Sequence, residues 1–160
     1  SGDTINLNTF NDGIYQIDVD GVSELKISQS LNITKAIAIM FLGDVKITGN
    51  ITADPGAIVI VIASGKITID HPVTALQGFY IADDLINTDD SDFDANDSQL
   101  TIKGGLISWV GINLWRNLSD NANAGELFIQ NNDMVNALKN TTTDLKAFKI
   151  YQYTWKEVAP

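Results

Sequence analysis

The sequence contains no cysteine, one histidine (His71) and one arginine (Arg116). The absence of cysteine excludes disulfide bonds, a thiolate nucleophile and zinc sites with cysteine ligands. A single histidine also gives no basis for a Ser-His-Asp triad or for a zinc site built from several imidazoles. His71 stands in Asp70-His71-Pro72, a sequence typical of a turn, so we interpret it as a turn residue.

Basic residues and long apolar runs are also scarce. Ten Lys and Arg residues stand against twenty Asp and Glu residues, which gives a formal net charge of −10 and a pI of about 4.2. Such a surface repels phosphates and anionic lipids, so we expect no nucleic-acid partner. The longest apolar runs, 36–42 and 57–63, fall far short of the roughly 20 residues that a membrane helix needs, so we expect no membrane span.

The sequence does have a glycine that returns every 22 residues, at Gly21, Gly43 and Gly65. Each glycine begins a short stretch in which polar and apolar residues alternate, as in Gly43-Asp-Val-Lys-Ile47. An alternation of period two is the pattern of a β-strand with one buried face. One strand cluster in each unit of fixed length is typical of a β-solenoid.

The repeat extends beyond the glycines, because an offset of 22 residues also aligns Leu25 with Ile47 and Ile69. We therefore predict an all-β fold, a short right-handed parallel β-helix of about four rungs. A β-sandwich is the alternative, since strands of these lengths also suit it. The 160 residues fit one domain, in which we expect an N-terminal strand cap over 1–20, the rungs over 21–108, and a C-terminal cap over 109–160 that contains one helix at 131–138.

Two runs, 36–42 and 57–63, are apolar on both strand faces instead of alternating. A solenoid strand buries only one face inward, so something must cover the other face. The predicted C-terminal helix is one candidate. A second copy of the chain or a partner protein is the other, so self-association through these two strands stays open.

An acidic insertion, residues 87–97, interrupts the repeat before the strand-like segment 100–108. Within it, Asp90, Asp92 and Asp94 have the D-x-D-x-D spacing of calcium loops, which supply several oxygen ligands from one tight turn. The insertion departs from an EF-hand at the glycine and glutamate positions. A solvated acidic loop and a calcium site both stay open, and we expect no other cofactor.

Four acidic residues, Asp83, Asp84, Asp89 and Asp90, resemble the acidic motifs of polygalacturonases, which are β-helical glycosidases. The resemblance implies a pair of carboxylates that serve as acid and base. The glycine-histidine-glycine and arginine-isoleucine-lysine motifs of that family have no counterpart in this sequence. Aromatic residues toward the C-terminus either form a platform for sugar stacking or fill the cap; these residues are Trp109, Trp115, Tyr151, Tyr153 and Trp155.

Segment 43–108 and the end of the chain carry a second resemblance. Gly78-Phe-Tyr-Ile-Ala82, Leu100-Thr-Ile-Lys-Gly-Gly-Leu-Ile-Ser108 and Tyr153-Thr-Trp-Lys-Glu-Val-Ala-Pro160 resemble secreted, surface-associated β-solenoid proteins of uncultured candidate-phylum bacteria. This resemblance implies an envelope or extracellular module. The glycine-led rungs are also similar to those of bactofilins, cytoskeletal β-helices that polymerise end to end.

These observations predict a non-enzymatic extracellular or cell-envelope module with a structural or adhesive role, as a subunit or domain of a larger surface assembly. The abundance of Asn, Asp and Thr is typical of strand-rich bacterial surface proteins, so we expect an extracellular or cell-surface location in a bacterium. A carbohydrate-binding or carbohydrate-active β-helix is the second hypothesis. A bactofilin-like intracellular polymer is the third.

Overall fold

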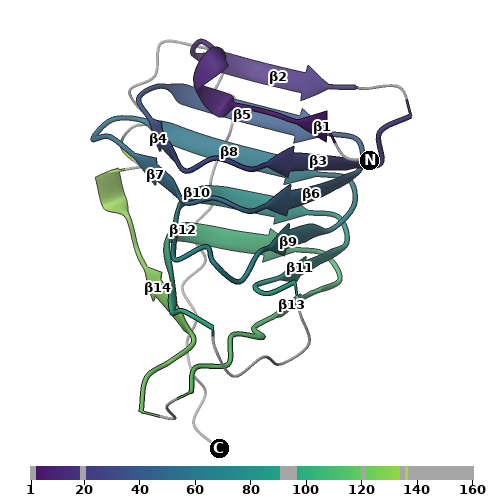
Figure 1. Ribbon diagram of the computed structural model, residues 1–160. Coiled ribbons are helices and arrows are strands. Elements are labelled where there is room, and N and C mark those ends of the chain that lie inside the picture. Colours follow the sequence, from purple (N-terminus) through teal and green to yellow (C-terminus); the bar gives the residue numbers. More distant parts are fainter. Residues whose placement is uncertain (1–2, 19–20, 91–96, 120–121, 134–135, 137–160) are drawn as a thin grey trace, which may run out of the picture.

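The computed structural model describes residues 3–18, 21–90, 97–119, 122–133 and 136. Over these residues the chain winds as a right-handed coil from its N-terminal to its C-terminal end (Figure 1). The fold is an all-β solenoid of about five turns, which confirms the predicted fold class. Every strand pair among the described residues is parallel, so the β-sandwich, which is built from antiparallel sheets, is excluded.

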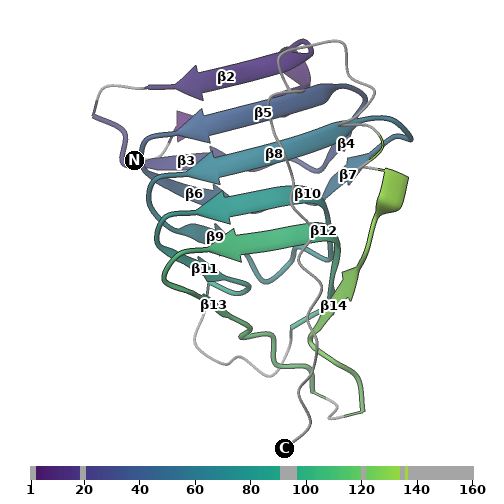
Figure 2. The same ribbon diagram turned by 180° about the vertical axis from the view of Figure 1, so that it is seen from behind.

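Two sheets form the long sides of the coil, and Figure 2 shows the second of them from outside. Sheet A contains, in spatial order, β1 (Asp3–Thr4), β3 (Glu24–Ile27), β6 (Asp44–Ile47), β9 (Ile67–Ile69), β11 (Leu85–Asn87) and β13 (Gly111–Asn113). Sheet B contains β14 (Glu126–Ile129), β12 (Leu100–Ser108), β10 (Ala75–Ala82), β8 (Ile58–Ala63), β5 (Ala36–Phe41) and β2 (Gly13–Ile17). A short third side, side C, contains β4 (Leu31–Ile33), β7 (Ile51–Ala53) and the beginning of β10.

In each full turn the chain passes from sheet A to side C, then to sheet B, and back to sheet A. We name the corners accordingly: the A–C corner, the C–B corner and the B–A corner. Because all strands are parallel, the connections of successive turns stack on one another at each corner. Residues far apart in the sequence are therefore neighbours at a corner.

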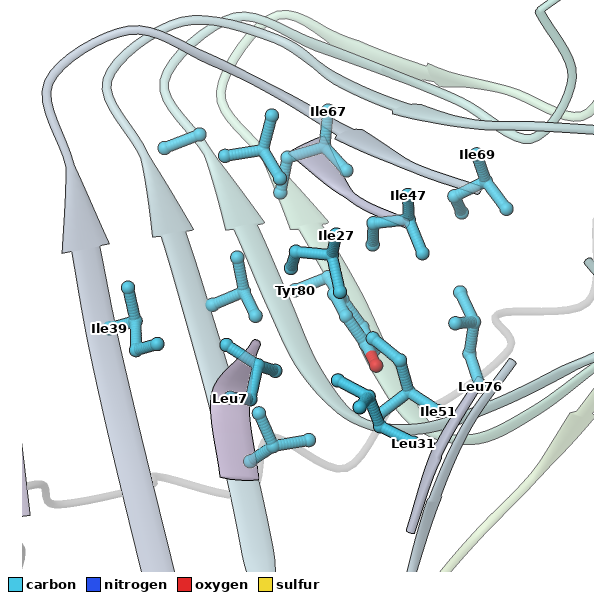
Figure 3. Close-up of a cluster of buried hydrophobic side chains, with 14 of the residues drawn as sticks. Leu7, Ile27, Leu31, Ile39, Ile47, Ile51, Ile67, Ile69, Leu76 and Tyr80 are labelled. Carbon is cyan, nitrogen blue, oxygen red and sulfur yellow. The ribbon is translucent and has the colours of Figure 1, made fainter. Parts of the chain in front are cut away.

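The core lies inside the coil, where inward side chains of the three sides meet (Figure 3). β-branched residues dominate it, because they fit the pleated surface of stacked strands. Tyr80 is buried there too; its hydroxyl donates to the Gln77 carbonyl oxygen (3.1 Å), and burial raises its pKa. The largest fully buried side chains are Tyr80, Phe41, Leu7, Ile27, Ile33, Ile37, Ile39, Ile47, Ile51, Ile58, Ile67 and Ile69.

The 22-residue repeat holds in only part of the coil. It fits β5 with β8 and β6 with β9. Between β3 and β6 the offset is 20 residues, so Leu25 pairs with Val45 and not with Ile47. The connection at 54–57, between β7 and β8, is two residues longer than its counterpart between β4 and β5 and restores the offset of 22. At the B–A corner only Gly43 and Gly65 stack on each other. Ser23, and not Gly21, lies beside Gly43, because the connection between β2 and β3 is longer than the one between β5 and β6.

Strands β10 and β12 run from side C into sheet B without such a connection. The bend falls at Gly78 and Gly104, which pair in register and have φ angles of 132° and 140°. A Cβ atom on Gly104 would lie 2.0 Å from the Gly78 carbonyl oxygen. Glycine is required here because these φ values disfavour other residues and the stacked backbones leave no room for a side chain.

The N-terminal end of the coil is closed. β1 pairs with β3 and β2 pairs with β5, so both strands belong to the coil and do not form a hairpin with each other. Between them the 3-10 helix η1 (Leu7–Thr9) places Leu7 on the core, where it is fully buried. The ring of Phe10 packs edge-on against Tyr15, with 4.7 Å between ring centroids.

The coil continues beyond residue 108, where we expected the C-terminal cap to begin. β13 pairs with β11 and β14 pairs with β12, so segment 111–129 adds a partial turn. The number of turns is therefore about five, whereas we expected about four. Residues 132, 133 and 136 are helical. The rest of the predicted helix at 131–138 lies outside the described residues, so the helical cap is not confirmed.

The last described turn leaves the C-terminal end of the coil open. Ile112 and Phe128 occupy inward positions, because they pair with the buried residues Ile86 and Ile102. They are nevertheless 39% and 47% exposed, since no strand of the described residues stacks on them. Leu114, two residues beyond Ile112, is also exposed. We call the apolar surface formed by Ile112, Leu114 and Phe128 the open end.

The outward face of sheet B is apolar, as the runs 36–42 and 57–63 predicted. Ala38, Ile58 and Ile60 belong to this face and form a second buried cluster, separate from the core. Met40 and Leu42, toward the B–A corner, are exposed. The outer face of sheet B is therefore shielded from solvent over part of β5 and β8, whereas outward residues of β2 and β12, such as Ile14 and Ile107, are exposed.

Candidate functional site at the acidic corner

Charged residues gather at the A–C corner of the last turns, beyond the ends of β9, β11 and β13. The acidic insertion follows β11, so the stacking of turns brings it against the connection after β9 and the chain after β13. We call this group the acidic corner; it comprises Lys46, Asp70, His71, Thr88, Asp89, Asp90, Asp97, Arg116 and Glu126.

The outer part of the acidic corner is an ion-pair network. Lys46 Nζ donates to Asp90 Oδ2 (2.9 Å) and lies 3.5 Å from Asp70 Oδ1. His71 Nδ1 lies 3.3 Å from Asp90 Oδ1. His71 itself sits in a turn closed by the Val73 N–H, which donates to the Asp70 carbonyl oxygen (3.0 Å), so its predicted turn position is confirmed.

The two carboxyl groups of this network titrate in opposite directions. A side-chain hydrogen bond with Asp70 lowers the pKa of Asp90, and bonds from Lys46 and His71 act in the same sense. Desolvation raises the pKa of Asp70, and the hydrogen bond with Asp90 adds to that rise. The same interactions raise the pKa of Lys46, chiefly through its bond to Asp90. Two carboxyl groups thus share one ammonium ion, and Asp70 is the one that takes up a proton more readily.

The ligand atoms of Asp70, His71 and Asp90 lie within 4.8 Å of one another, close enough to hold a metal ion. The Lys46 ammonium already places a positive charge against both carboxylates, so the chain supplies its own counter-ion there. Of the predicted calcium ligands, only Asp90 is described, and it is engaged by Lys46. Asp92 and Asp94 lie outside the described residues, so the choice between a calcium site and a solvated acidic loop stays untested.

Arg116 holds the inner part of the acidic corner together. Its side chain is buried, and all of its guanidinium nitrogens donate to backbone carbonyl oxygens. Nε donates to Thr88 (2.6 Å), Nη2 to Asp70 (2.8 Å), and Nη1 to His71 and to Ser98. One side chain thereby joins connections from three successive turns.

Two buried carboxylates and one half-buried carboxylate balance the charge of Arg116. Asp89 is fully buried, and the Asp97 carboxylate accepts the Asn117 N–H (2.7 Å). Glu126 Oε1 accepts both the Arg116 N–H (3.1 Å) and the Thr88 hydroxyl. Desolvation lowers the pKa of Arg116, while these three carboxylates oppose that shift. Because an arginine stays protonated in proteins, the inner corner is a buried cation surrounded by anions.

The four carboxylates of the glycosidase hypothesis are divided between two corners. Asp83 and Asp84 precede β11 at the B–A corner and are exposed. Asp89 and Asp90 follow β11 at the A–C corner, where the first is buried and the second is ion-paired. The strand between them alone spans about 10 Å. The structure therefore does not bring the four together around one substrate.

The predicted aromatic platform is also only partly present in the described residues. Trp109 is 74% exposed at the B–A corner. Its backbone N–H donates to the carbonyl oxygen of Ala82, the residue directly before Asp83 (3.2 Å). Trp115 lies at the acidic corner, where its backbone N–H donates to Thr88 Oγ1 (2.9 Å). Tyr151, Tyr153 and Trp155 lie outside the described residues.

Sequence reasoning assigned Arg116 only to the C-terminal cap and missed its role. Its partners are backbone carbonyl groups of distant turns, and no residue type marks such a group in a sequence. The one signal in the sequence was that Arg116 is the single arginine of an acidic chain. Arginine is the residue suited to a buried site that needs a planar cation with five hydrogen-bond donors, so this chain has one candidate for such a site.

In the described part of the chain, no helix has the length and apolar character that a membrane crossing requires. A scan against protein-family models, a search of curated proteins and a search of solved structures each found no match.

Proposed function

We propose that this chain is a non-enzymatic structural or adhesive module of a bacterial cell surface, and that it joins a larger assembly through the open end of its coil. The observation that carries this proposal is the exposure of Ile112 and Phe128, two residues at core positions of the last turn. A coil that ends without covering its inward side chains offers a surface suited to another apolar edge.

The backbone adds to this surface. Among the strands that the structure describes, β13 and β14 are the last of their sheets, so each presents N–H and C=O groups to which no described strand pairs on one side. A second strand edge would satisfy those groups and cover the inward side chains at the same time. Burying a side chain of this size completely contributes about 1.5–3 kcal/mol, so each half-exposed residue of the open end offers about 1 kcal/mol.

The acidic corner supports a structural role for its charged residues. Lys46, Asp70 and Asp90 bind one another, and Arg116 binds backbone carbonyl groups. Groups engaged in this way hold connections in place. A general acid and base, in contrast, must face a space that a substrate can enter.

Molar mass tests the proposal. We expect the mass measured by light scattering during size exclusion to rise above 17.4 kDa as the protein concentration increases, because open ends pair. Phe128→Asp should return the protein to a monomer. Ile14→Asp, at an exposed outward position near the closed end, is the matched control and should leave the mass unchanged. A monomer at every concentration would contradict pairing of open ends.

A second candidate function, carbohydrate binding, is favoured by Trp109. Its exposed side chain belongs to a segment whose backbone bonds to Ala82, directly before the exposed residues Asp83 and Asp84, and an apolar ring together with hydrogen-bond acceptors suits a sugar. Binding to a panel of surface polysaccharides should be lost in Trp109→Ala and kept in Trp109→Phe. Equal binding by both variants would count against this site.

The bactofilin-like polymer is less well supported. A head-to-tail filament needs complementary surfaces at both ends of the coil. The N-terminal end is closed by Leu7, Phe10 and Tyr15, so the two ends differ in kind.

A further inference from the structure

A hollow of about 290 Å³ lies on the outside of the coil at the C–B corner. It lies between the connection 54–57 and the chain after β14, which turns back toward the N-terminal end of the coil and reaches the level of β7 (Figure 1). Its lining residues all belong to the described part of the chain. This volume is close to the lower end of the range for ligand sites, so it suits a small ligand. We call this hollow the corner pocket.

The floor of the corner pocket is a row of outward side chains. Gln77 on β10 pairs in register with Lys103 on β12, and Lys103 pairs in register with Ile129 on β14. Side chains at paired positions of neighbouring strands project from the same face, so these three stand next to one another. Gln77 Oε1 accepts the backbone N–H of Ala53. This bond fixes the orientation of the amide group and leaves Nε2 as a donor for a ligand.

The connection 54–57 forms a rigid wall of the corner pocket. The Ala57 N–H donates to the Asp54 carbonyl oxygen (2.9 Å), which closes a turn with Pro55 and Gly56 at its centre. Proline fixes the backbone at its position, and Gly56 has a φ angle of 89°, as the third residue of a type II turn requires. Asn32 Nδ2 donates to Asp54 Oδ1 (2.8 Å) and holds that carboxylate in place. The wall is therefore shaped before a ligand arrives.

Three charged side chains line the corner pocket without neutralising one another. Lys103 belongs to the floor, Asp54 to one wall and Asp133 to the other. Among the described residues, none of the three takes part in an ion pair. At the acidic corner, in contrast, Lys46, Asp70 and Asp90 bind one another. An ammonium group and two carboxylates are therefore available to a ligand in the corner pocket.

These groups favour a neutral ligand that is rich in hydroxyl groups. An anion would meet two carboxylates, and a cation would meet the ammonium group of Lys103. A hydroxyl group, however, donates to a carboxylate and accepts from an ammonium or an amide group, so it matches all of them. Ile129 and Pro55 add apolar contacts for the carbon atoms of a ring.

We propose that the corner pocket binds a sugar ring through Gln77, Lys103, Asp54 and Asp133. A smaller hollow of about 50 Å³ adjoins it along side C and shares Gln77 and Lys103 with it. A saccharide chain therefore extends from the corner pocket into this second hollow. The site lies at the opposite end of β12 from Trp109, and it requires neither sugar binding by Trp109 nor pairing of open ends.

Nuclear magnetic resonance of the isotope-labelled full chain tests the proposal. Glucose, galactose, mannose and N-acetylglucosamine are each titrated to about 50 mM, which is several times the expected Kd. We expect at least one of them to shift the side-chain amide signals of Gln77 and the backbone amide signals of Lys103 and Ile129. A ligand of about twelve non-hydrogen atoms should bind with a Kd of about 1–10 mM.

Three variants identify the groups that bind the sugar. Lys103→Met and Asp133→Asn each remove one charge and nearly keep the size of the side chain, so each should raise the Kd about tenfold. Gln77→Glu keeps the acceptor for the Ala53 N–H and loses the donor, so it should act in the same direction. Lys66→Met, at an exposed lysine away from the corner pocket, is the matched control and should leave the Kd unchanged. Far-UV circular dichroism must show that the sheets are retained in each variant.

The proposal is overturned if none of the four sugars shifts the signals of Gln77, Lys103 and Ile129. It is also overturned if Lys103→Met and Asp133→Asn bind the sugar as tightly as the parent protein. Shifts confined to the indole signal of Trp109 would assign the sugar to that residue and contradict a site at the corner pocket. If glycine, a zwitterion, shifts the signals of the corner pocket and the sugars do not, the ligand class that we assign is wrong.

Discussion

Replacing Arg116 tests whether a single buried cation holds three turns of the coil together. In Arg116→Gln the side chain loses its charge and most of its donors, so the carbonyl groups of Asp70, His71 and Thr88 lose their partner. Asp89 stays buried beside the site, now without the nearby cation. The substitution therefore leaves several buried hydrogen-bond acceptors without a donor and a buried carboxylate without a nearby cation.

The magnitude follows from measured losses of this kind. Removing one partner of a buried ion pair costs about 3–5 kcal/mol of unfolding free energy, since the remaining charge is left uncompensated. Domains of ordinary size have about 5–15 kcal/mol in total, so a large share of the stability is at stake. With a urea m-value of about 2 kcal/mol/M, the midpoint should fall by about 2 M.

The assay is urea unfolding followed by far-UV circular dichroism. Lys66→Gln is the control, because Lys66 is an exposed cation that lies 3.9 Å from Asp44 at the surface. Exposed ion pairs contribute at most about 1 kcal/mol, so the control midpoint should move by less than about 0.5 M. Arg116→Lys should fall between the two, since it keeps the charge and loses the planar fork of donors. If Arg116→Gln and Lys66→Gln shift the midpoint equally, the role we assign to Arg116 is wrong.

Four further predictions concern the acidic corner and the bend of sheet B. The pKa of Asp90 is lowered in the folded state, so its ionised carboxylate stabilises the fold above the ordinary pKa of about 4, and this stabilisation is lost as the pH falls. Asp90→Asn should therefore be less stable than the parent protein at pH 7. In a pH series of urea midpoints, the difference between the two proteins should shrink below about pH 4. The pKa of Asp70 is raised in the folded state, so its ionisation lowers the stability of the fold as the pH rises through that pKa. The stability of Asp70→Asn relative to the parent protein should therefore be greater at pH 7 than at pH 3. If the relative stability of Asp70→Asn and of Asp90→Asn changed in the same direction with pH, the coupling between these two carboxyl groups would be contradicted. Gly104→Ala should cost about 3 kcal/mol or more, because its Cβ would meet the Gly78 carbonyl oxygen, and an unchanged thermal midpoint would show that the bend is not as tight as described. Since Asp90 is already bound by Lys46, we expect the same thermal midpoint in calcium and in chelator, and a calcium-dependent rise that Asp92→Asn removes would establish the loop as a calcium site.

The fold class could be predicted because the sequence states it locally. Alternation in stretches such as 43–47 and 65–69 specifies strands with one inward face, and a period of about 22 residues specifies a coil. The register could not be predicted from one offset, since each corner has its own connection length. The last turn was missed because β13 has only three residues and β14 exposes most of its own, so neither shows a buried alternating pattern.

The acidic corner was predicted only in part. The insertion after β11 was visible as a break in the repeat, and Asp90 was named from its spacing to Asp92 and Asp94. Its observed partners, Lys46 and His71, come from two earlier turns, and only the three-dimensional stacking of corners brings them together. The carboxylates proposed for a glycosidase are close in sequence, but a short strand separates them in space. Residues that are close in the sequence were therefore grouped wrongly, because the stacking of turns determines which charged residues meet.

Amide hydrogen exchange, measured at low and at high protein concentration, most directly tests the claim that the open end is the surface through which this chain joins an assembly. We predict that the amides of β13 and β14 become protected as the concentration rises, because edge strands gain hydrogen-bond partners there. The amides of β1 and β2, at the closed end, should exchange at the same rate in both samples. Protection that is the same at both concentrations in β13 and β14, or that appears at the closed end instead, would contradict the account.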